Sequence, residues 1–378
     1  MAKNKVCRTG IGRLQTRRFP IKPAKEMKRI GNLFDRICSM DNLREADEKA
    51  RRGKRKSYGV RLHDRDREAN LTRLRESLLS GTFSTSGYNT FTIHEPKERL
   101  VYRLPYYPDR IVHHAVMNVL EPVWMSVFTA DTYSCIKGRG IHAAARKLKR
   151  ALREDPEGTR YCLKMDIRKF YPSIDHGTLK SIMRKKIKDA RLLSLLDEIV
   201  ASAPGVPIGN YLSQYFANLY LAYFDHWIKE EKRARHYYRY ADDMVLLSSD
   251  KGELHRLREE IEEHLASLRL ELKPDWQVFP VGARGIDFLG YVFFPTHTRL
   301  RKSIKQRMFR TAGRMARASP GKVIPRFAGW NGWMKHCDSR NLKRKLLNRF
   351  EHEIKLDRTP FRPGTNRHGK MALQLQHQ

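Results

Sequence analysis

The chain has 378 residues, enough for a sizeable buried core and for two or three subdomains. It carries 76 Lys and Arg against 41 Asp and Glu, a formal charge of +35. An excess of this size, spread along the whole chain, favours nucleic acid as the partner and makes a membrane surface the less favoured alternative. Because 40% of the residues are hydrophobic, the sequence predicts a folded protein and not a disordered one.

Apolar segments and cysteine pairs that the sequence lacks indicate its compartment and bear on zinc binding. It has no run of about 18 apolar residues and no short apolar segment close to Met1. Its five cysteines include no C-x-x-C pair. We therefore expect a cytoplasmic protein in a reducing compartment, with no membrane partner and no zinc site.

The N-terminal 57 residues are basic and contain apolar positions at helical spacing, which predict one helix over residues 32–50. The basic run that follows, residues 51–56, is either a solvated linker or a phosphate-binding segment. A second helix is expected over residues 64–79, because apolar residues recur there helically and Gly81 stops the pattern.

Two β-rich runs, residues 88–93 and 99–103, flank a polar turn and predict a projecting hairpin. Lys97, Arg99 and Arg103 cluster on this hairpin, so we interpret them as candidate ligands for a triphosphate or for the template.

Two helices are predicted after the hairpin. The first opens at Pro108 and has apolar residues on its buried side as far as Val119. The second covers residues 141–152 and follows a basic glycine loop, residues 137–140. A G-x-G pattern alone is weak support for phosphate binding, although glycines let a phosphate backbone approach closely.

Residues 161–167 alternate as a strand, with apolar side chains on one face and Asp166 on the other. A carboxylate at the end of an otherwise apolar strand is costly without a counter-charge, which makes Asp166 a candidate functional residue. A helix over residues 180–201, a Pro- and Gly-rich loop over 204–209 and a long apolar helix over 210–229 are expected next.

Asp242 and Asp243 belong to the stretch Tyr240–Asp243, which lies between two β-rich runs, residues 236–239 and 244–248. They are either turn residues only, because Asp tolerates turn geometry, or carboxylates held for a divalent metal. The second interpretation needs a carboxylate on a neighbouring strand, and Asp166 supplies it if the strands pair in one antiparallel sheet. Convergent hard oxygen ligands suit Mg²⁺, and two such ions would activate a 3′-hydroxyl and stabilise leaving pyrophosphate. That chemistry is nucleotidyl transfer.

The remainder of the chain begins with a predicted amphipathic helix over residues 253–268. Strands are predicted over residues 270–279 and 286–294. Beyond residue 298 the chain is basic and mostly helical in pattern, and residues 358–378 are expected to form a flexible tail.

Four motifs in a fixed order make the chain resemble a reverse transcriptase from about Tyr58 to about Phe350. Their sequences are KMDIRKFYPSID, VPIGNYLSQ, YADD and FLGY, starting at residues 164, 206, 240 and 288. The resemblance implies an α/β (α+β) right-hand polymerase with fingers, a palm whose antiparallel sheet is flanked by helices, and a helical thumb. The expected divisions are a basic N-terminal extension (1–57), fingers (58–160), palm (161–294), basic helical thumb (295–357) and flexible tail (358–378).

The resemblance also implies roles for individual residues. Asp166 and Asp242 would bridge two Mg²⁺ ions, for which Mn²⁺ can substitute, and Asp243 would support them. Ile167 is the fourth position expected to bind metal. Tyr171 would lie under the sugar and exclude a 2′-hydroxyl. The other residues expected beside the nucleotide are Lys97, Arg99, Arg103, Phe170, Ile208 and Gln214. The residues expected to position the primer end are Phe288, Leu289, Gly290 and Tyr291.

The subfamily is indicated by residues 208–214, which read IGNYLSQ where most reverse transcriptases have QGxxxSP. This replacement, with further likeness in residues 94–100, 208–220, 276–281 and 285–291, resembles the reverse transcriptases of diversity-generating retroelements. Such bacterial or phage enzymes copy a template-repeat RNA into cDNA with frequent errors opposite template adenines. The implied partners are template RNA, a cDNA primer, dNTPs and a small basic pentameric accessory protein.

Ile208 offers a physical hypothesis for the errors. The usual Gln can form a hydrogen bond at this place and Ile208 cannot, so a polar constraint worth about 1–3 kcal/mol is lost. Alternatively, Ile208 is only a packing residue. Two other functions stay open: a reverse transcriptase of the group II intron or retron type, and an RNA-binding protein with a catalytically silent polymerase fold. Ala241, where Met is also common, decides little.

Overall fold

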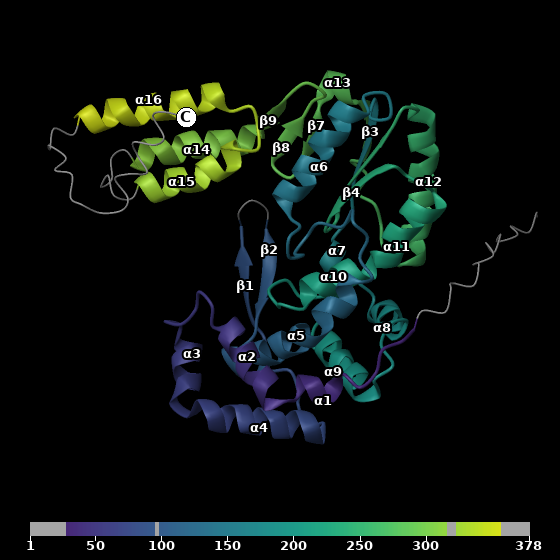
Figure 1. Ribbon diagram of the computed structural model, residues 1–378, viewed down its shortest axis with the longest axis vertical. Coiled ribbons are helices and arrows are strands. Elements are labelled where there is room, and N and C mark those ends of the chain that lie inside the picture. Colours follow the sequence, from purple (N-terminus) through teal and green to yellow (C-terminus); the bar gives the residue numbers. More distant parts are fainter. Residues whose placement is uncertain (1–27, 95–97, 316–322, 357–378) are drawn as a thin grey trace, which may run out of the picture.

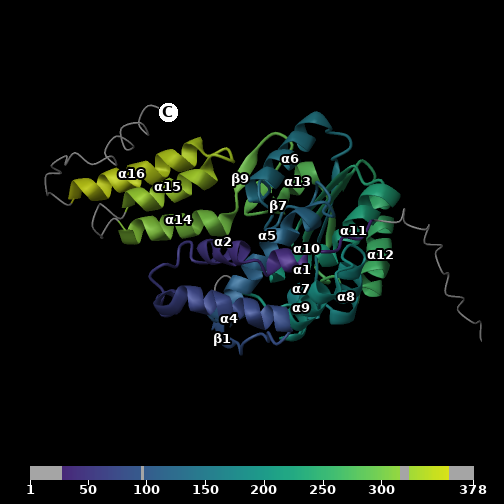
Figure 2. The ribbon, with the colours of Figure 1, turned by 60° about the horizontal axis from the view of Figure 1, so that its bottom comes forward.

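The structure, a computed structural model, describes residues 28–94, 98–315 and 323–356 (Figure 1). Figure 1 shows the helices and the two-stranded hairpin of the N-terminal part in the lower half, the four-stranded sheet with its helices at the upper right, and three C-terminal helices at the upper left, and Figure 2 shows the same parts from another side. In these three segments, no helix has the length and the apolar composition that crossing a membrane requires.

The N-terminal part is mainly helical. Its elements are α1 (Phe34–Ile37), α2 (Met40–Ala50), α3 (Tyr58–His63), η1 (Asp64–Asp66), α4 (Arg67–Ser80), β1 (Asn89–Ile93), β2 (Arg99–Arg103), η2 (Tyr106–Arg110) and α5 (Ile111–Met125). The single helix predicted over residues 32–50 is wrong, because the Ser39 hydroxyl accepts a hydrogen bond from the Asn42 N–H and starts a new helix. The predicted end at Gly81 is confirmed, and this residue caps α4 with a φ of +73°.

Part of the predicted N-terminal extension lies in the core of the protein. Leu43, Ala46 and Ala50 of α2 are buried, and α2 packs along α5. Ion pairs also tie this segment down, since Arg51 binds the fully buried Asp47. Residues 33–51 therefore form one unit with the predicted fingers, whereas residues 1–27 lie outside the described residues.

The central sheet has the strand order β4-β5-β3-β6, with every neighbouring pair antiparallel. This confirms the antiparallel sheet predicted for the palm. The strands are β3 (Tyr161–Asp166), β4 (His236–Tyr240), β5 (Asp243–Ser248) and β6 (Gln277–Pro280). The surrounding helices are α6 (Ile141–Glu154), α7 (Phe170–Ser173), α8 (His176–Arg184), α9 (Ala190–Ala201), α10 (Ser213–Tyr220), α11 (Ala222–His226), η3 (Trp227–Glu231), α12 (Lys251–Ser267) and α13 (Val281–Arg284).

Both faces of this sheet are covered by helices, with α6 on one side and α12 on the other (Figures 1 and 2). Cys162 of β3 belongs to the same apolar cluster as Leu148 of α6. On the opposite face, Leu163 belongs to the same cluster as Ile261 of α12. Although the predicted boundary at residue 160 assigns α6 to the fingers, this helix packs on the sheet of the palm.

Three predicted elements are interrupted in the structure. The helix predicted over residues 180–201 is two helices, α8 and α9, because the Asp189 side chain caps a new start at Leu192 N–H. The helix predicted over 210–229 begins only at Ser213 and continues as α10, α11 and η3. Of the strand predicted over 270–279, only the end is in β6.

The C-terminal part confirms the predicted helices. It comprises β7 (Ile286–Phe288), β8 (Tyr291–Phe293), β9 (Thr298–Leu300), α14 (Lys302–Met315), α15 (Val323–Met334) and α16 (Arg340–Leu356). The strand predicted over residues 286–294 is in fact a hairpin. Leu289 and Gly290 have φ values of +56° and +85°, which form a two-residue turn between β7 and β8.

Candidate active site

Three carboxylates meet at one end of the central sheet. The register of β3 and β5 places Asp166 directly opposite Asp243, as expected from the sequence. Asp242 lies in the adjoining turn, and its carbonyl accepts a hydrogen bond of 3.3 Å from the Ile167 N–H. Burial raises the pKa of Asp242, and the negative charge of Asp166 raises it further. Asp166 and Asp242 are therefore electrostatic neighbours in a partly dehydrated site.

Each of two carboxylates faces a lysine. The Lys273 ammonium binds Asp166, and the Lys164 ammonium binds Asp243. Burial lowers the pKa of Lys164 to about 8. The sequence held a signal for Lys164, which precedes Asp166 by two positions and so shares its face of β3. It held none for Lys273, which is brought from 107 residues away.

Two of the three carboxylates have the donor chemistry that a divalent cation requires. Within the described ranges, no group of three or more His, Cys, Asp or Glu side chains is arranged to hold a metal ion. The pair Asp166 and Asp242 nevertheless has the hard oxygen donors that Mg²⁺ prefers, and its mutual repulsion is the feature that a cation would relieve. Asp243 is oriented toward Lys164, and its supporting role stays a prediction. The residues present fit a cation at Asp166 and Asp242.

A buried polar network holds the turn that carries Asp242. Arg239 is fully buried, and its guanidinium donates to the Ala241 carbonyl at 3.1 Å. The same guanidinium donates twice to Asp225, at 2.7 and 2.5 Å. Asp225 accepts two further hydrogen bonds, from the Tyr237 hydroxyl at 2.8 Å and the Thr132 hydroxyl at 2.7 Å. The sequence analysis missed this network, because its members come from different elements, α11, β4 and a loop 93 residues before Asp225, that only the fold brings together.

Tyr171 lies next to the carboxylates. Burial raises its pKa to about 12, and the charge of Asp242 contributes in the same direction. Its carbonyl accepts a 2.9 Å hydrogen bond from the Val206 N–H, which fixes its backbone to the following loop. Phe170, by contrast, is only 2% exposed and packs edge-on against Tyr171. The Phe170 ring therefore supports Tyr171 from the core, and its predicted place beside the nucleotide stays a prediction.

The loop over residues 206–213 joins the hairpin to this site. The Ile208 carbonyl accepts a 2.8 Å hydrogen bond from the Tyr102 N–H of β2. At Gly209 the φ is +127°, and a Cβ there would lie 2.2 Å from the Tyr102 carbonyl oxygen, so only glycine fits. The buried Ser213 hydroxyl donates to the Pro207 carbonyl at 2.6 Å. Ile208 is half-buried and Gln214 is exposed on the first turn of α10.

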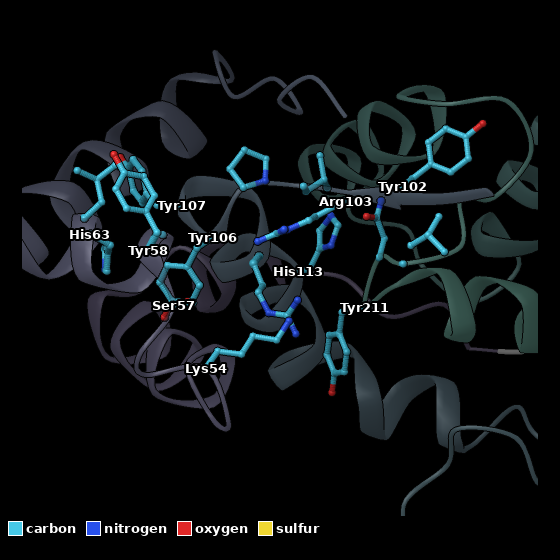
Figure 3. A pocket seen from close by; sticks show the side chains of 18 of the residues that line it. Lys54, Ser57, Tyr58, His63, Tyr102, Arg103, Tyr106, Tyr107, His113 and Tyr211 are labelled. Atoms are coloured by element: carbon cyan, nitrogen blue, oxygen red, sulfur yellow. The ribbon is translucent and has the colours of Figure 1, made fainter. Parts of the chain in front are cut away.

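Two of the three basic residues predicted on the hairpin, Arg99 and Arg103, are described and lie at opposite ends of β2. Arg99 is exposed at the start of β2, and its charge lowers the pKa of Asp242, so it lies within electrostatic range of the site. Arg103, at the other end of β2, lines a cavity of about 920 Å³ (Figure 3). Lys97 lies outside the described residues.

The motif Phe288–Tyr291 forms the turn between β7 and β8 and connects the sheet to the C-terminal helices. Phe288 is fully buried, with the Lys164 ammonium 5.2 Å from the centre of its ring. The Tyr291 hydroxyl donates to the Trp333 carbonyl at 3.0 Å. On one side the motif therefore contacts Lys164, which is paired with Asp243. On the other side it contacts α15.

Comparison with known proteins identifies one family and several relatives of the chain. Residues 94–293, more than half of the chain, match the family model described as "Reverse transcriptase (RNA-dependent DNA polymerase)". Protein YkfC from Escherichia coli (strain K12) is 28% identical over 264 residues, which cover 58% of this chain and 69% of that protein. Group II intron-encoded protein LtrA from Lactococcus lactis subsp. cremoris is 25% identical over 178 residues, covering 44% of this chain and only 29% of that protein.

Among solved structures, apo telomerase from Candida Tropicalis aligns with a TM-score of 0.43 at 12% identity, covering 56% of this chain and 48% of that chain. The matched residues 94–293 contain all four motifs of the sequence analysis.

Proposed function

The chain belongs to the reverse transcriptase (RNA-dependent DNA polymerase) family, and from this premise we propose that it copies RNA into DNA by metal-assisted nucleotidyl transfer. The observation that carries the proposal is the position of Asp242 beside Asp166 at the end of the β3–β5 pair. Both carboxylates are present, so the alternative of a catalytically silent fold has no support from the site residues.

In this proposal Asp166 and Asp242 hold the cations, and Asp243 with the Ile167 backbone keeps the two strands in place. Two bound Mg²⁺ ions, or Mn²⁺ in their place, would supply the charge that activates the primer 3′-hydroxyl and stabilises the leaving pyrophosphate. Lys273 and Arg99 provide positive charge toward the triphosphate. Tyr171 closes the site below the sugar, where its ring would collide with a 2′-hydroxyl.

We assign the chain, within this family, to the diversity-generating retroelement type, with template-repeat RNA as its template. Support comes from Ile208 and Gln214, which replace the Gln and Pro of the usual QGxxxSP motif. The loop carrying Ile208 is bonded to Tyr102 of the hairpin and, through Val206, to Tyr171 beside the carboxylates. An apolar side chain at position 208 removes a polar restraint on the incoming nucleotide, which would favour errors at template adenines. A small basic pentameric accessory protein is the proposed protein partner.

A group II intron-type reverse transcriptase is the second candidate. The observation that favours it is the similarity of 178 residues to the intron-encoded protein LtrA. The two candidates share the chemistry and differ in template and in fidelity, so a measurement of copying errors separates them.

The test is cDNA synthesis with Mg²⁺ on an adenine-containing RNA, followed by sequencing of the products. Wild type, Asp242→Asn and Ile208→Gln are compared, with the accessory protein and cognate RNA added in a second series. Errors concentrated at template adenines in wild type, fewer errors in Ile208→Gln and no cDNA from Asp242→Asn would support the proposal. Faithful cDNA from wild type would move the assignment to the intron type, and cDNA from Asp242→Asn would contradict the assigned chemistry.

A further inference from the structure

Asp243 has a neutralising partner on its own face of the central sheet. The register places Asp166 opposite Asp243 and Lys164 opposite Val245, so Lys164 is the diagonal neighbour of Asp243. The Lys164 ammonium binds the Asp243 carboxylate, whose Oδ1 is buried and accepts no hydrogen bond from any other residue that the structure describes. Only 23% of the Lys164 side chain is exposed. Water and salt therefore screen this pair less than an ion pair on the surface.

An aromatic ring holds the Lys164 ammonium in this position. The ammonium lies 5.2 Å from the centre of the Phe288 ring, within the range of a cation–π contact. Phe288 is fully buried at the end of β7, and it belongs to the same apolar cluster as Val245, the residue opposite Lys164. Because core packing fixes the ring, the ammonium is held between a buried aromatic face and the Asp243 carboxylate.

The contact with Lys164 sets how many carboxylates are available to a cation. Three carboxylates meet at this end of the sheet, yet in the described part of the chain no three acidic, His or Cys side chains are arranged around one metal position. The reason is that Asp243 is turned toward the ammonium. Asp166 and Asp242 remain as the pair of charges that repel each other. Mg²⁺ commonly binds one or two carboxylates and completes its ligands with substrate phosphates.

We infer that Lys164 is a positioning residue for the proposed reaction, and that by holding Asp243 it limits the cation site to Asp166 and Asp242. The inference rests on the proposed function. With Asp243 occupied, a divalent cation binds weakly until the nucleotide brings its phosphates. A lysine that only stabilised the fold would weaken the cation site when removed. Removal of the positioning lysine has the opposite effect, because Asp243 becomes a third ligand and more carboxylate charge tightens cation binding.

The test measures cation binding in the absence of RNA, primer and nucleotide. Mn²⁺ is titrated into the full chain, and free Mn²⁺ is followed by its electron paramagnetic resonance signal. We expect Lys164→Met to lower the Mn²⁺ Kd about tenfold, because loss of the ammonium and release of Asp243 both favour the cation. Lys164→Arg should keep the wild-type Kd, because a guanidinium also pairs with a carboxylate.

Lys232→Met is the matched control. The Lys232 ammonium also lies between a carboxylate and an aromatic ring, 2.9 Å from Glu260 and 5.2 Å from the centre of the Trp227 ring. This variant loses the same two kinds of contact and the same charge, and it should leave the Mn²⁺ Kd unchanged. Asp242→Asn supplies the background, because it removes one of the two proposed ligands and should bind Mn²⁺ much more weakly than wild type.

Two further variants show whether the effect passes through Asp243. The double variant Lys164→Met with Asp243→Asn should return to the wild-type Kd, because it removes one charge of each sign and leaves no carboxylate to be released. Phe288→Leu keeps both charges and loses only the ring, so it should lower the Kd about threefold, the size of one cation–π contact. Thermal unfolding curves in EDTA establish that each variant is folded at the temperature of the titration.

An unchanged or raised Mn²⁺ Kd in folded Lys164→Met would overturn the inference, as would equal effects of Lys164→Met and Lys232→Met. A double variant that binds Mn²⁺ as tightly as Lys164→Met would also overturn it, because Asp243 would then not be the released ligand. If Lys164→Met is unfolded, Phe288→Leu decides, and an unchanged Kd there counts against the inference. Failure of the proposed function appears separately, as a lack of cDNA from a wild-type chain that shows the expected pattern of cation binding.

Discussion

The strongest prediction concerns Arg239, which joins the Asp225 carboxylate to the Ala241 carbonyl in the turn before Asp242. Ala241 has a φ of +55°, a conformation that costs a non-glycine residue about 1 kcal/mol and needs support from its surroundings. In Arg239→Lys the charge stays, but one ammonium cannot reach both partners. We therefore expect the turn to lose its anchor and Asp242 to shift.

The size of the effect can be worked from the hydrogen bonds. Arg239 donates twice to Asp225 and once to Ala241. Loss of one or two hydrogen bonds to charged groups should lower the free energy of unfolding by about 2–4 kcal/mol. A displacement of Asp242 by about 1 Å should slow nucleotide addition by about 100-fold. A weaker cation site should also raise the Mg²⁺ concentration needed for half of the maximal rate.

Tyr237→Phe is the matched control, because it removes one hydrogen bond to the same Asp225 carboxylate and leaves the Arg239 hydrogen bond to the turn in place. It should cost about 1 kcal/mol of stability and leave both the rate and the Mg²⁺ dependence unchanged. The assay is single-nucleotide addition across a Mg²⁺ titration, at a temperature where thermal unfolding curves show both variants folded. If Arg239→Lys and Tyr237→Phe give the same rate and the same Mg²⁺ dependence, Arg239 does not position Asp242.

Three further predictions follow from single residues. Gly209→Ala should lower the cDNA rate at least tenfold at a stability cost of about 1–3 kcal/mol, because its Cβ would collide with the Tyr102 carbonyl. Gly87→Ala, with nothing within 4 Å of its Cβ, should change neither. Burial lowers the pKa of His113 from the ordinary 6.5 to about 3. The unfolded state therefore binds a proton at a higher pH than the folded state does. The free energy of unfolding consequently falls as the pH drops from 6.5 toward 3. Urea unfolding should show that wild type loses about 2 kcal/mol more than His113→Leu between pH 7 and pH 5. The pKa of His114 is also lowered by burial, to about 4, so the variant keeps a loss of its own. Equal losses in the two proteins would refute the assignment to His113. Tyr171→Ala should accept ribonucleotides in primer extension, and continued exclusion of them would remove Tyr171 as the sugar gate.

The sequence was most informative where the signal was local. The strand over residues 161–167 and the hairpin around Asp242 were predicted from strand periodicity and turn chemistry, which are properties of short segments. That Asp166 meets Asp243 depended on the further condition that these strands pair, and the register meets that condition. The end of α4 at Gly81 was predictable for the same reason. These features needed no knowledge of what packs against them.

The features that the sequence analysis did not predict depend mainly on contacts between distant parts of the chain. Asp189 starts α9 and also accepts hydrogen bonds from the Leu33 and Phe34 N–H groups, more than 150 residues earlier, so the break there is decided by tertiary structure. The contact between Lys273 and Asp166 is likewise decided by tertiary structure, because the two residues are 107 positions apart. The turn at Leu289 and Gly290 was missed because an apolar leucine in a left-handed conformation is unusual in the middle of a β-rich run.

The turn at Gly290 limits how the C-terminal helices can be exchanged with those of a relative. A Cβ at Gly290 would lie 2.7 Å from Ile304 of α14 and 2.9 Å from Trp333 of α15, and the Gly290 carbonyl accepts a hydrogen bond from the Arg301 N–H. A chimaera joined at residue 295 would set a foreign surface against this turn. A chimaera joined before β7, at residue 285, would transfer the turn with the helices that are shaped to it, and it should retain the correct approach of the thumb to the palm.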